Sequence, residues 1–420
     1  NFMPRIGLAY QLDRNTVVRA GYGIYFVPYG QRFLAAEGAV PGFDTNTISI
    51  ASPDGVRFNR TLDNIFPDGL AAAAGSSGGL STFLGQGATI PAYRNNPNGY
   101  NQRWQLSVQR RIGGVYVLEA RYVGNRTIKM PLARSRNALP IEYLSRSPER
   151  DQPRIDYLTT RVNNPFFGIP GVAGNLSSAS QVGYSDLLTP FPQFTNITVQ
   201  EPQGWSTYHA LQVEFQRRYS NGLSFQTGYT FAKTMDGLSF LNAADPRPEK
   251  VISELDRPHI WRLLGQYELP FARRNPILGG WRMQGITFFQ SGNPINFGNV
   301  IYRGDIHAIR TEGQTPDRLF NVDAGFERNS ALQLQSNLRT FPSRLAGVRM
   351  GNAWNTDFSV IKSVKVKERF EGQFRAEAYN LFNQHFIQGA VDTSPVSRTF
   401  GSSVAASGPR TLQLGLKVVF

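Results

Sequence analysis

The last twelve residues of the chain, Pro409–Phe420, alternate between apolar and polar side chains. One face of this stretch carries Leu412, Leu414, Leu416, Val418 and Phe420, and the other carries Thr411, Gln413, Gly415 and Lys417. A period of two predicts an amphipathic β-strand. Such a strand can end a soluble protein. Alternatively, its apolar face meets lipid and its polar face meets a water-filled lumen, as in an outer-membrane barrel.

The same period of two recurs along the chain and predicts eleven strands. In chain order they are Met3–Leu12, Thr16–Val27, Tyr100–Ile112, Val115–Asn125, Trp205–Tyr219, Leu223–Thr234, Pro258–Leu269, Trp281–Ser291, Asn355–Val366, Phe370–Phe382 and Pro409–Phe420.

The connections between these strands alternate between short and long. Short turns follow the first, third, fifth, seventh and ninth strands, and longer irregular segments follow the others. In membrane barrels the periplasmic turns are short and the extracellular loops are long, whereas a soluble β-sandwich has no reason to keep this order. The sequence therefore predicts an all-β fold, an antiparallel up-and-down transmembrane β-barrel portion of about eleven strands.

The composition narrows the alternatives. Of the 420 residues 40% are apolar, and no run approaches the ~20 apolar residues of a membrane-spanning helix. The absence of cysteine excludes disulfides and thiolate chemistry. A net charge of +14 would point to a polyanion partner in a soluble protein, but the basic residues are scattered, often along the polar faces. We therefore expect a lumen lining and contact with anionic lipid, and no nucleic-acid partner.

The tryptophans lie near the ends of the predicted strands, which is typical of the two aromatic girdles of a membrane barrel. These residues are Trp104, Trp205, Trp261, Trp281 and Trp354. The alternative is that the aromatic residues fill a core. Lys362 breaks the pattern, because it falls on an apolar face, and we expect it to snorkel or to lie at a bulge.

The polar faces supply the residues that we expect to line the lumen. These candidates are Arg19, Gln105, Gln212, Glu214, Gln216, Gln226, Arg262, Gln266, Gln373, Arg375, Glu377 and Gln413. Their Gln and Arg side chains offer exchangeable hydrogen bonds and a mild preference for anions. Arg375 shares its face with Glu371 and Glu377, which predicts pairing between them.

No catalytic arrangement stands out, so we do not expect an enzyme, a metal site or a cofactor. The histidines are His209, His259, His307 and His385, and their spacing is not that of metal ligands, so hydrogen-bonded rim or lumen positions are expected. Asp256 and Arg257 precede Pro258, and a salt bridge between them at the strand entry is the simple interpretation.

The number of strands has a topological consequence. With eleven antiparallel strands the first and the last run in the same direction, whereas an all-antiparallel barrel needs an even number. The chain also starts directly in strand-like sequence, without a signal peptide. We therefore expect residues 1–420 to be the C-terminal part of a larger transmembrane barrel domain.

Ten stretches of the chain resemble the C-terminal part of TonB-dependent outer-membrane receptors, and most of all the Oar-like group. They are Pro4–Tyr10, Val18–Tyr25, Gln105–Arg110, Tyr208–Val213, Leu223–Phe231, Asp256–His259, Gly279–Trp281, Gln290–Pro294, Phe374–Asn383 and Gly408–Phe420. The resemblance covers nearly every strand and few of the long loops. It implies a barrel of 22 strands, with a plug, a TonB box and an N-terminal carboxypeptidase-regulatory-like domain elsewhere in the protein.

The resemblance also implies a place and partners. The chain would lie in the cell outer membrane among lipid and lipopolysaccharide, meet the barrel assembly machinery through its last strand, and depend on the TonB–ExbB–ExbD complex through a segment outside this sequence. The expected function is TonB-dependent uptake of a scarce chelate, oligosaccharide or peptide, or Oar-like export. A passive porin-like channel and a soluble polyanion-binding β-sandwich or adhesin remain the alternatives.

Overall fold

The computed structural model describes the chain except for residues 1, 27–44, 53, 74, 91–96, 173, 272–274, 276–277, 367–369, 404 and 420. Phe420, the last residue of the predicted apolar face, thus lies outside the described residues.

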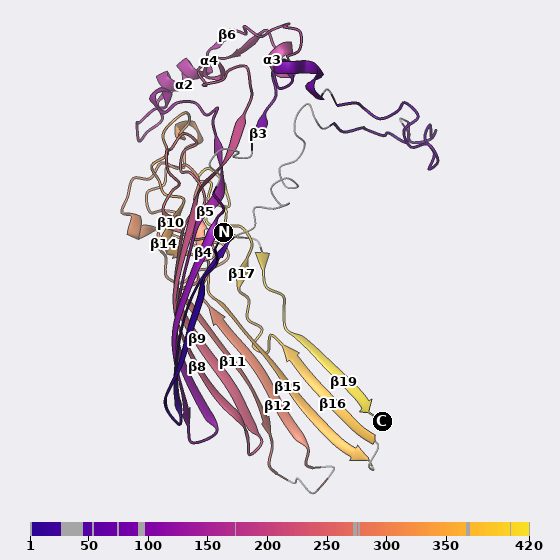
Figure 1. Cartoon of the computed structure of the whole chain (residues 1–420), viewed down its shortest axis with the longest axis vertical. Coiled ribbons are helices and arrows are strands. Elements are labelled where there is room, and N and C mark those ends of the chain that lie inside the picture. Colours follow the sequence, from indigo (N-terminus) through magenta and orange to yellow (C-terminus); the bar gives the residue numbers. More distant parts are fainter. Residues whose placement is uncertain are drawn as a thin grey trace.

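Eleven strands form one antiparallel sheet in which spatial order follows chain order (Figure 1). They are β1 (Arg5–Asp13), β2 (Thr16–Phe26), β4 (Tyr100–Ile112), β5 (Tyr116–Ser135), β8 (Ile197–Ser220), β9 (Leu223–Gly237), β11 (His259–Glu268), β12 (Trp281–Gln290), β15 (Ala353–Val366), β16 (Phe370–Tyr379) and β19 (Thr411–Val419). Two short strands join this sheet at its margin, β3 (Ala88–Ile90) beside β8 and β10 (Val251–Ile252) beside β9. The predicted all-β antiparallel fold and its eleven strands are confirmed.

The alternation of short and long connections is also confirmed. The short turns gather at the lower end of the sheet in Figure 1, and the long loops extend from the upper end. Local chemistry explains the two-residue turn between β8 and β9, where Asn221 and Gly222 have φ values of 53° and 82°. A two-residue hairpin loop needs positive φ values at both positions, and Asn-Gly adopts them at low cost.

Two strands are longer than the sequence pattern predicts. β5 continues past Asn125 to Ser135, and β8 begins at Ile197 rather than at Trp205. The added segments contain Pro131 and Pro202, which break the apolar alternation. The register between β5 and β8 shifts on both sides of Met130, so the prolines lie where the regular ladder is interrupted. Proline is tolerated in a sheet at such bulges, which is why the strands continue.

The long loops contain short elements of their own. The helices are η1 (Gly75–Ser81), η2 (Ile141–Tyr143), α2 (Gln152–Thr159), α3 (Asn175–Ser178), α4 (Tyr184–Leu187), η3 (Ile306–Ile309) and η4 (Ser330–Leu332). The paired strands are β6 (Arg161–Asn163) with β7 (Gln181–Gly183), β13 (Pro294–Asn296) with β14 (Arg344–Arg349), and β17 (Ile387–Gln388) with β18 (Ala405–Ala406). Among the described residues there is no helix with the length and apolar character needed to cross a membrane.

A compact hydrophobic core lies in the loops rather than beside the sheet. It consists of buried side chains from the β12–β15 and β16–β19 loops: Ile295, Phe297, Val300, Ile309, Leu319, Phe320, Phe326, Phe341, Val348 and Phe400. Phe320 joins the two loops, because its ring centroid lies 5.2 Å from that of Phe297 and 5.1 Å from that of Phe400, both edge to face. These loops therefore form one packed unit, which we call the loop core.

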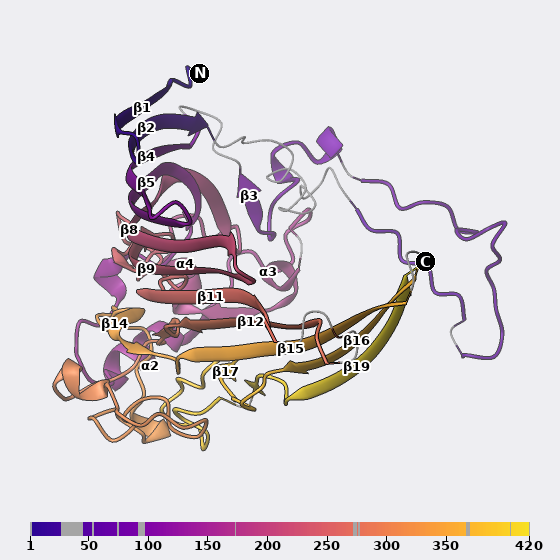
Figure 2. The same cartoon turned by 90° about the horizontal axis from the view of Figure 1, so that it is seen from below.

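The main sheet is a curved wall with two open edges (Figure 2). In the described part of the chain, β1 and β19 each pair with one neighbour only. The apolar side of β19 is exposed, with Leu412 at 71% and Leu414 at 74%, instead of packing between two sheets. This exposure does not fit the soluble β-sandwich alternative.

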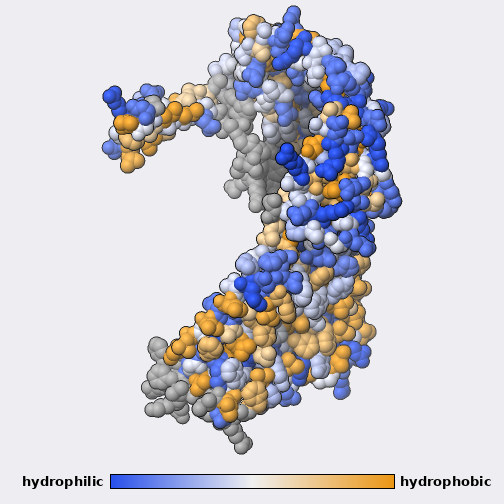
Figure 3. Space-filling model, turned by 180° about the vertical axis from the view of Figure 1, so that it is seen from behind, coloured by the Kyte–Doolittle hydropathy of each residue, from blue (hydrophilic) through white to orange (hydrophobic). Residues whose placement is uncertain are grey.

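On the face seen in Figure 3, hydrophobic residues gather over the lower half, which holds the strands, and hydrophilic residues dominate the loop end. This division is the one that a bilayer imposes on a barrel wall, because hydrocarbon accepts only apolar side chains on the outer surface.

Candidate functional site

The register of the sheet sorts its side chains onto two faces. On one face Arg19 pairs with Ser107, Ser107 with Arg121, and Arg121 with Gln212, across four neighbouring strands. Continued over the sheet, this register puts all twelve lumen candidates on the same side, which we call the polar face: Arg19, Gln105, Gln212, Glu214, Gln216, Gln226, Arg262, Gln266, Gln373, Arg375, Glu377 and Gln413. That the polar face lines a lumen stays a prediction.

The opposite side, the apolar face, carries the five tryptophans and the alternating apolar residues of β19. The register places there Trp104, Trp205, Trp261, Trp281, Trp354, Leu412, Leu414, Leu416 and Val418. One detail differs from the sequence prediction: Trp205 does not begin its strand, because β8 starts at Ile197. The aromatic girdle itself stays a prediction.

Hydrogen bonds connect several of the polar-face candidates across neighbouring strands. Gln226 Nε2 donates to Glu214 Oε1 at 2.7 Å, and Gln284 Nε2 donates to Gln266 Oε1 at 3.2 Å. These bonds hold the side chains against the wall. Their amide groups can exchange partners with a solute at low cost, because a hydrogen bond to water or to a solute replaces them.

The expected pairing of Arg375 with carboxylates is wrong. Its Nε donates to Gln373 Oε1 at 2.6 Å, and no ion pair with Glu371 or Glu377 forms among the described residues. Gln373 and Glu377 are both two residues from Arg375 on the same strand face, and the guanidinium bonds the amide of Gln373.

Two buried ion pairs fasten the loop core to the sheet. Arg344 Nη2 lies 3.1 Å from Asp236 Oδ1, and Arg349 Nη2 lies 2.5 Å from Asp256 Oδ2. The side chain of Asp256 is 1% exposed, so its charge is almost fully removed from water. The predicted salt bridge between Asp256 and Arg257 is therefore wrong in its partner. The true partner, Arg349, lies 93 residues further along the chain on β14, and no local sequence pattern predicts this pairing.

Two histidines form matching pairs with tyrosine on the apolar face. His209 Nδ1 lies 2.8 Å from the Tyr122 hydroxyl, and His259 Nδ1 lies 2.7 Å from the Tyr229 hydroxyl. In both pairs the rings also stack. Hydrogen bonding was expected for the histidines and is found for these two, and both lie on the face opposite the lumen candidates. Their pairing with Tyr122 and Tyr229 was not predicted, although aromatic residues with a polar tip suit a membrane interface.

Lys362 lies on the apolar face, as its strand position predicts. Its Nζ donates to the backbone oxygen of Gly279 in the β11–β12 turn and lies 5.5 Å from the ring centroid of Trp281. The ladders on both sides of Lys362 are regular, so the bulge alternative is wrong. The ammonium group instead reaches toward the turn, where Lys362 is only 9% exposed. That the head group snorkels to water stays a prediction.

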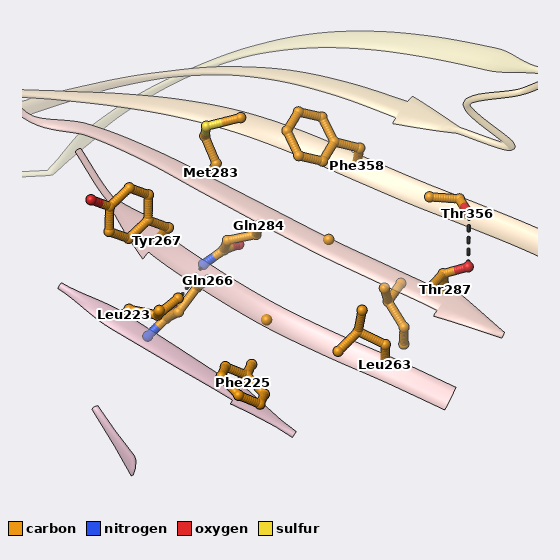
Figure 4. Close-up of a pocket in the computed structure, with 13 residues that line it drawn as sticks. Leu223, Phe225, Leu263, Gln266, Tyr267, Met283, Gln284, Thr287, Thr356 and Phe358 are labelled. Carbon is orange, nitrogen blue, oxygen red and sulfur yellow. Dashed lines mark hydrogen bonds between the residues drawn. The ribbon is translucent and has the colours of Figure 1, made fainter. Parts of the chain in front are cut away.

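Each face also has a hollow. The hollow of the apolar face has a volume of about 600 Å³ and lies where Gly265 pairs with Gly285 (Figure 4). Phe225 and Phe358 flank this pair of glycines in the same cross-strand row. Because Gly265 and Gly285 are paired and have no side chains, they leave a depression in this face of the sheet. A second hollow of about 800 Å³ involves polar-face residues of β1, β2, β4, β5 and β8.

Comparison with known proteins identifies the family. A model of the outer membrane beta barrel domain matches residues 1–413. A search of curated proteins gives no match.

Among solved structures, three similar ones come from bacteria. The outer membrane transporter YddB from Escherichia coli has 12% identity and a TM-score of 0.49, with 100% of this chain and 40% of that chain covered. The ferripyoverdine receptor of Pseudomonas aeruginosa has 12% identity and a TM-score of 0.44, with 100% and 33% covered. The FrpB iron transporter from Neisseria meningitidis has 10% identity and a TM-score of 0.42, with 100% and 39% covered.

The chain thus spans 33% to 40% of the length of these three proteins. The family model, in contrast, extends over nearly the whole chain and every strand of the sheet but the end of β19. The chain therefore belongs to the outer membrane beta barrel domain family, and its place is the cell outer membrane.

Proposed function

We propose that the chain forms part of the wall of a TonB-dependent receptor that takes up a scarce solute such as a chelate, an oligosaccharide or a peptide. The observation that carries this proposal is the sorting of the sheet into one polar and one apolar face. A wall of this kind separates hydrocarbon from a water-filled interior through which polar solutes can pass. The resemblance to Oar-like receptors supports the same function, and export is the second direction that it allows.

We further propose that residues 1–420 are the C-terminal part of a barrel domain. Because ten antiparallel pairings separate β1 from β19, these two edge strands run in the same direction. An all-antiparallel closure then requires an odd number of further strands. Eleven more would give the 22 strands that the resemblance implies, and a plug and a TonB box would belong to the rest of the protein.

The partners follow from the same proposal. The apolar face would contact outer-membrane lipid and lipopolysaccharide, and the exposed edge of β19 would meet the barrel assembly machinery. The TonB–ExbB–ExbD complex would act on a segment outside this sequence. No catalytic step forms part of the proposed function.

A passive porin is the second candidate. The loop core favours a receptor, because a packed unit of two loops offers a fixed surface for recognising a solute. Conductance of the whole protein in planar bilayers tests the choice. A plugged receptor should pass no steady ion current until denaturant loosens the plug, whereas steady current through the untreated protein would support the porin and contradict the proposal.

A further inference from the structure

The polar-face hollow has a floor of small residues between basic walls. Gly7 and Gly21 pair directly with each other at its base. The next row of the ladder on one side holds Arg5 and Arg103, and the next row on the other side holds Arg19 and Arg121. These four arginines line the same hollow, which has a volume of about 800 Å³. We call it the basic recess.

Neither packing nor backbone conformation requires glycine on this floor. A Cβ added to Gly7 would have nothing within 4 Å, and one added to Gly21 would meet only ordinary contacts, the nearest at 3.5 Å. Neither residue has a positive φ. The missing side chains therefore leave open space beneath the arginines, and this space is available to a bound group.

The arginines are incompletely neutralised. Arg121 pairs with Glu119 at 2.6 Å, whereas Arg19 donates to the amide oxygen of Gln109 at 2.7 Å. Arg103 donates to Asn101 Oδ1 at 2.9 Å. In the described part of the chain, four guanidinium groups thus face the recess and Glu119 is the one carboxylate that pairs with any of them.

An aromatic ring orders two of the guanidinium groups. The Cζ atoms of Arg5 and Arg103 lie 4.9 Å and 5.4 Å from the centroid of the Tyr25 ring. Cation–π contact of this kind holds an arginine in place and uses the face of its guanidinium group, so that N–H donors at the edge can still bind an oxyanion. The guanidinium groups of Arg5 and Arg103 are therefore preorganised for binding an anion.

We infer that the basic recess binds the oxyanion group, a carboxylate, phosphate or sulfate, of a small solute that passes along the wall. Arginine forks bind such groups with two parallel hydrogen bonds, and Gln105 and Gln212 at the margin supply neutral donors. A volume of about 800 Å³ lies in the range of small-molecule sites. The inference rests on the proposed function, because only a solute-conducting wall presents its polar face to solutes.

The test compares three sugars that share one ring and differ at C6: neutral glucose, glucuronate with a carboxylate, and glucose 6-phosphate with a phosphate. Each is titrated calorimetrically into the whole protein in detergent at low ionic strength. We expect at least one anionic sugar to bind at least about tenfold more tightly than glucose, and added salt to weaken that binding. Preference for glucuronate or for glucose 6-phosphate would identify the group as a carboxylate or a phosphate.

Variants locate the site. The double variant Arg19→Gln/Arg103→Gln should lose about tenfold or more of the anion affinity. Gly21→Leu should lose a similar amount, because it fills the floor. Arg110→Gln is the matched control, since Arg110 stands on the same strand but on the apolar face, and it should bind like the unmodified chain.

Equal binding of the three sugars, or anion binding that the recess variants leave unchanged, would overturn the inference. Heat-dependent migration in gels confirms folding of each sample before titration. A folded chain without anion preference would contradict the basic recess alone, whereas the conductance experiment separately tests the proposed receptor.

Discussion

At the scale of single residues, the apolar face is built on contacts between aromatic rings and glycine. The Trp104 ring occupies the space that a Cβ on Gly124 would need, and Trp205 does the same above Gly237. Both are direct cross-strand pairs. An aromatic ring that covers the bare backbone of glycine restores the packing that the missing side chain would provide. Glycine is thus required at these two positions by close approach and not by backbone dihedral angles.

This arrangement gives the first prediction. Gly124→Ala should lower the free energy of unfolding by about 1–3 kcal/mol, because the new methyl group displaces the Trp104 ring. Urea unfolding of the detergent-folded chain measures the change. The matched control is Gly228→Ala, where the nearest atom lies 3.9 Å from the added Cβ and little effect is expected. Equal stability of both variants would show that the ring moves aside freely.

A second prediction concerns the protonation of one loop residue. Asp151 accepts from Ser145 Oγ at 2.6 Å and from the Arg154 backbone N at 3.1 Å, where it caps α2. The Ser145 hydroxyl first, and the Arg154 N–H second, hold the pKa of Asp151 below its ordinary value. A lowered folded-state pKa stabilises the loop above the unfolded value of about 3.9, and this stability disappears as pH falls through the folded value.

We therefore expect the amide protection of α2 to be full at neutral pH and to fall below about pH 4. Hydrogen exchange followed by mass spectrometry measures this protection. Asp151→Asn should lower protection at neutral pH and remove most of its pH dependence. An unchanged pH profile in that variant would assign the effect to another group.

At the scale of elements, the sequence predicts the regular strands well and the loops poorly. The period of two in β9 or β19 reflects a physical constraint, because each strand faces two different surroundings. The extensions of β5 past Asn125 and of β8 before Trp205 lack this period, since Pro131 and Pro202 lie where the ladder is interrupted. The loop core has no period at all. Phe297, Phe320 and Phe400 come together through folding of distant segments, which single-sequence patterns do not encode.

The attachment of the loop core gives a third prediction. Arg349→Gln leaves Asp256 charged and buried, which should destabilise the contact between β14 and the β10–β11 segment by about 3–5 kcal/mol. Faster hydrogen exchange across β13 and β14 would report the loss. The double variant Asp256→Asn/Arg349→Gln should recover much of the protection, because no unpaired charge remains.

The control for this prediction is Arg318→Gln. Arg318 pairs with Asp323 at 3.2 Å, and both side chains are largely exposed, at 51% and 69%. Its removal should cost less than about 1 kcal/mol. Comparable exchange in Arg318→Gln and Arg349→Gln would contradict a fastening role for the buried pair.

At the scale of the whole molecule, the main sheet has two different faces and two open edges, so its strands form an open sheet and not a closed barrel. The lumen candidates and the tryptophans could be assigned to opposite faces from the sequence, since the alternation holds along the regular ladders of all eleven strands and the register shifts lie outside these positions. The basic recess could not be predicted from the sequence. Its residues come from β1, β2, β4 and β5, and only the register of these strands brings them together. The composition shows an excess of positive charge, but it does not show which basic side chains lie close together in the folded sheet.

In the membrane we expect the apolar face to meet lipid and the polar face to meet water. Because the chain contains no cysteine, single spin labels can be placed on neighbouring residues of one strand with Leu414→Cys and Gln413→Cys, and on another with Phe225→Cys and Gln226→Cys. Electron paramagnetic resonance in lipid vesicles then measures collisions with oxygen, which concentrates in hydrocarbon, and with a water-soluble nickel chelate. Labels at 414 and 225 should favour oxygen and labels at 413 and 226 the chelate, whereas the same preference at neighbouring positions, or the reverse order, would contradict the account.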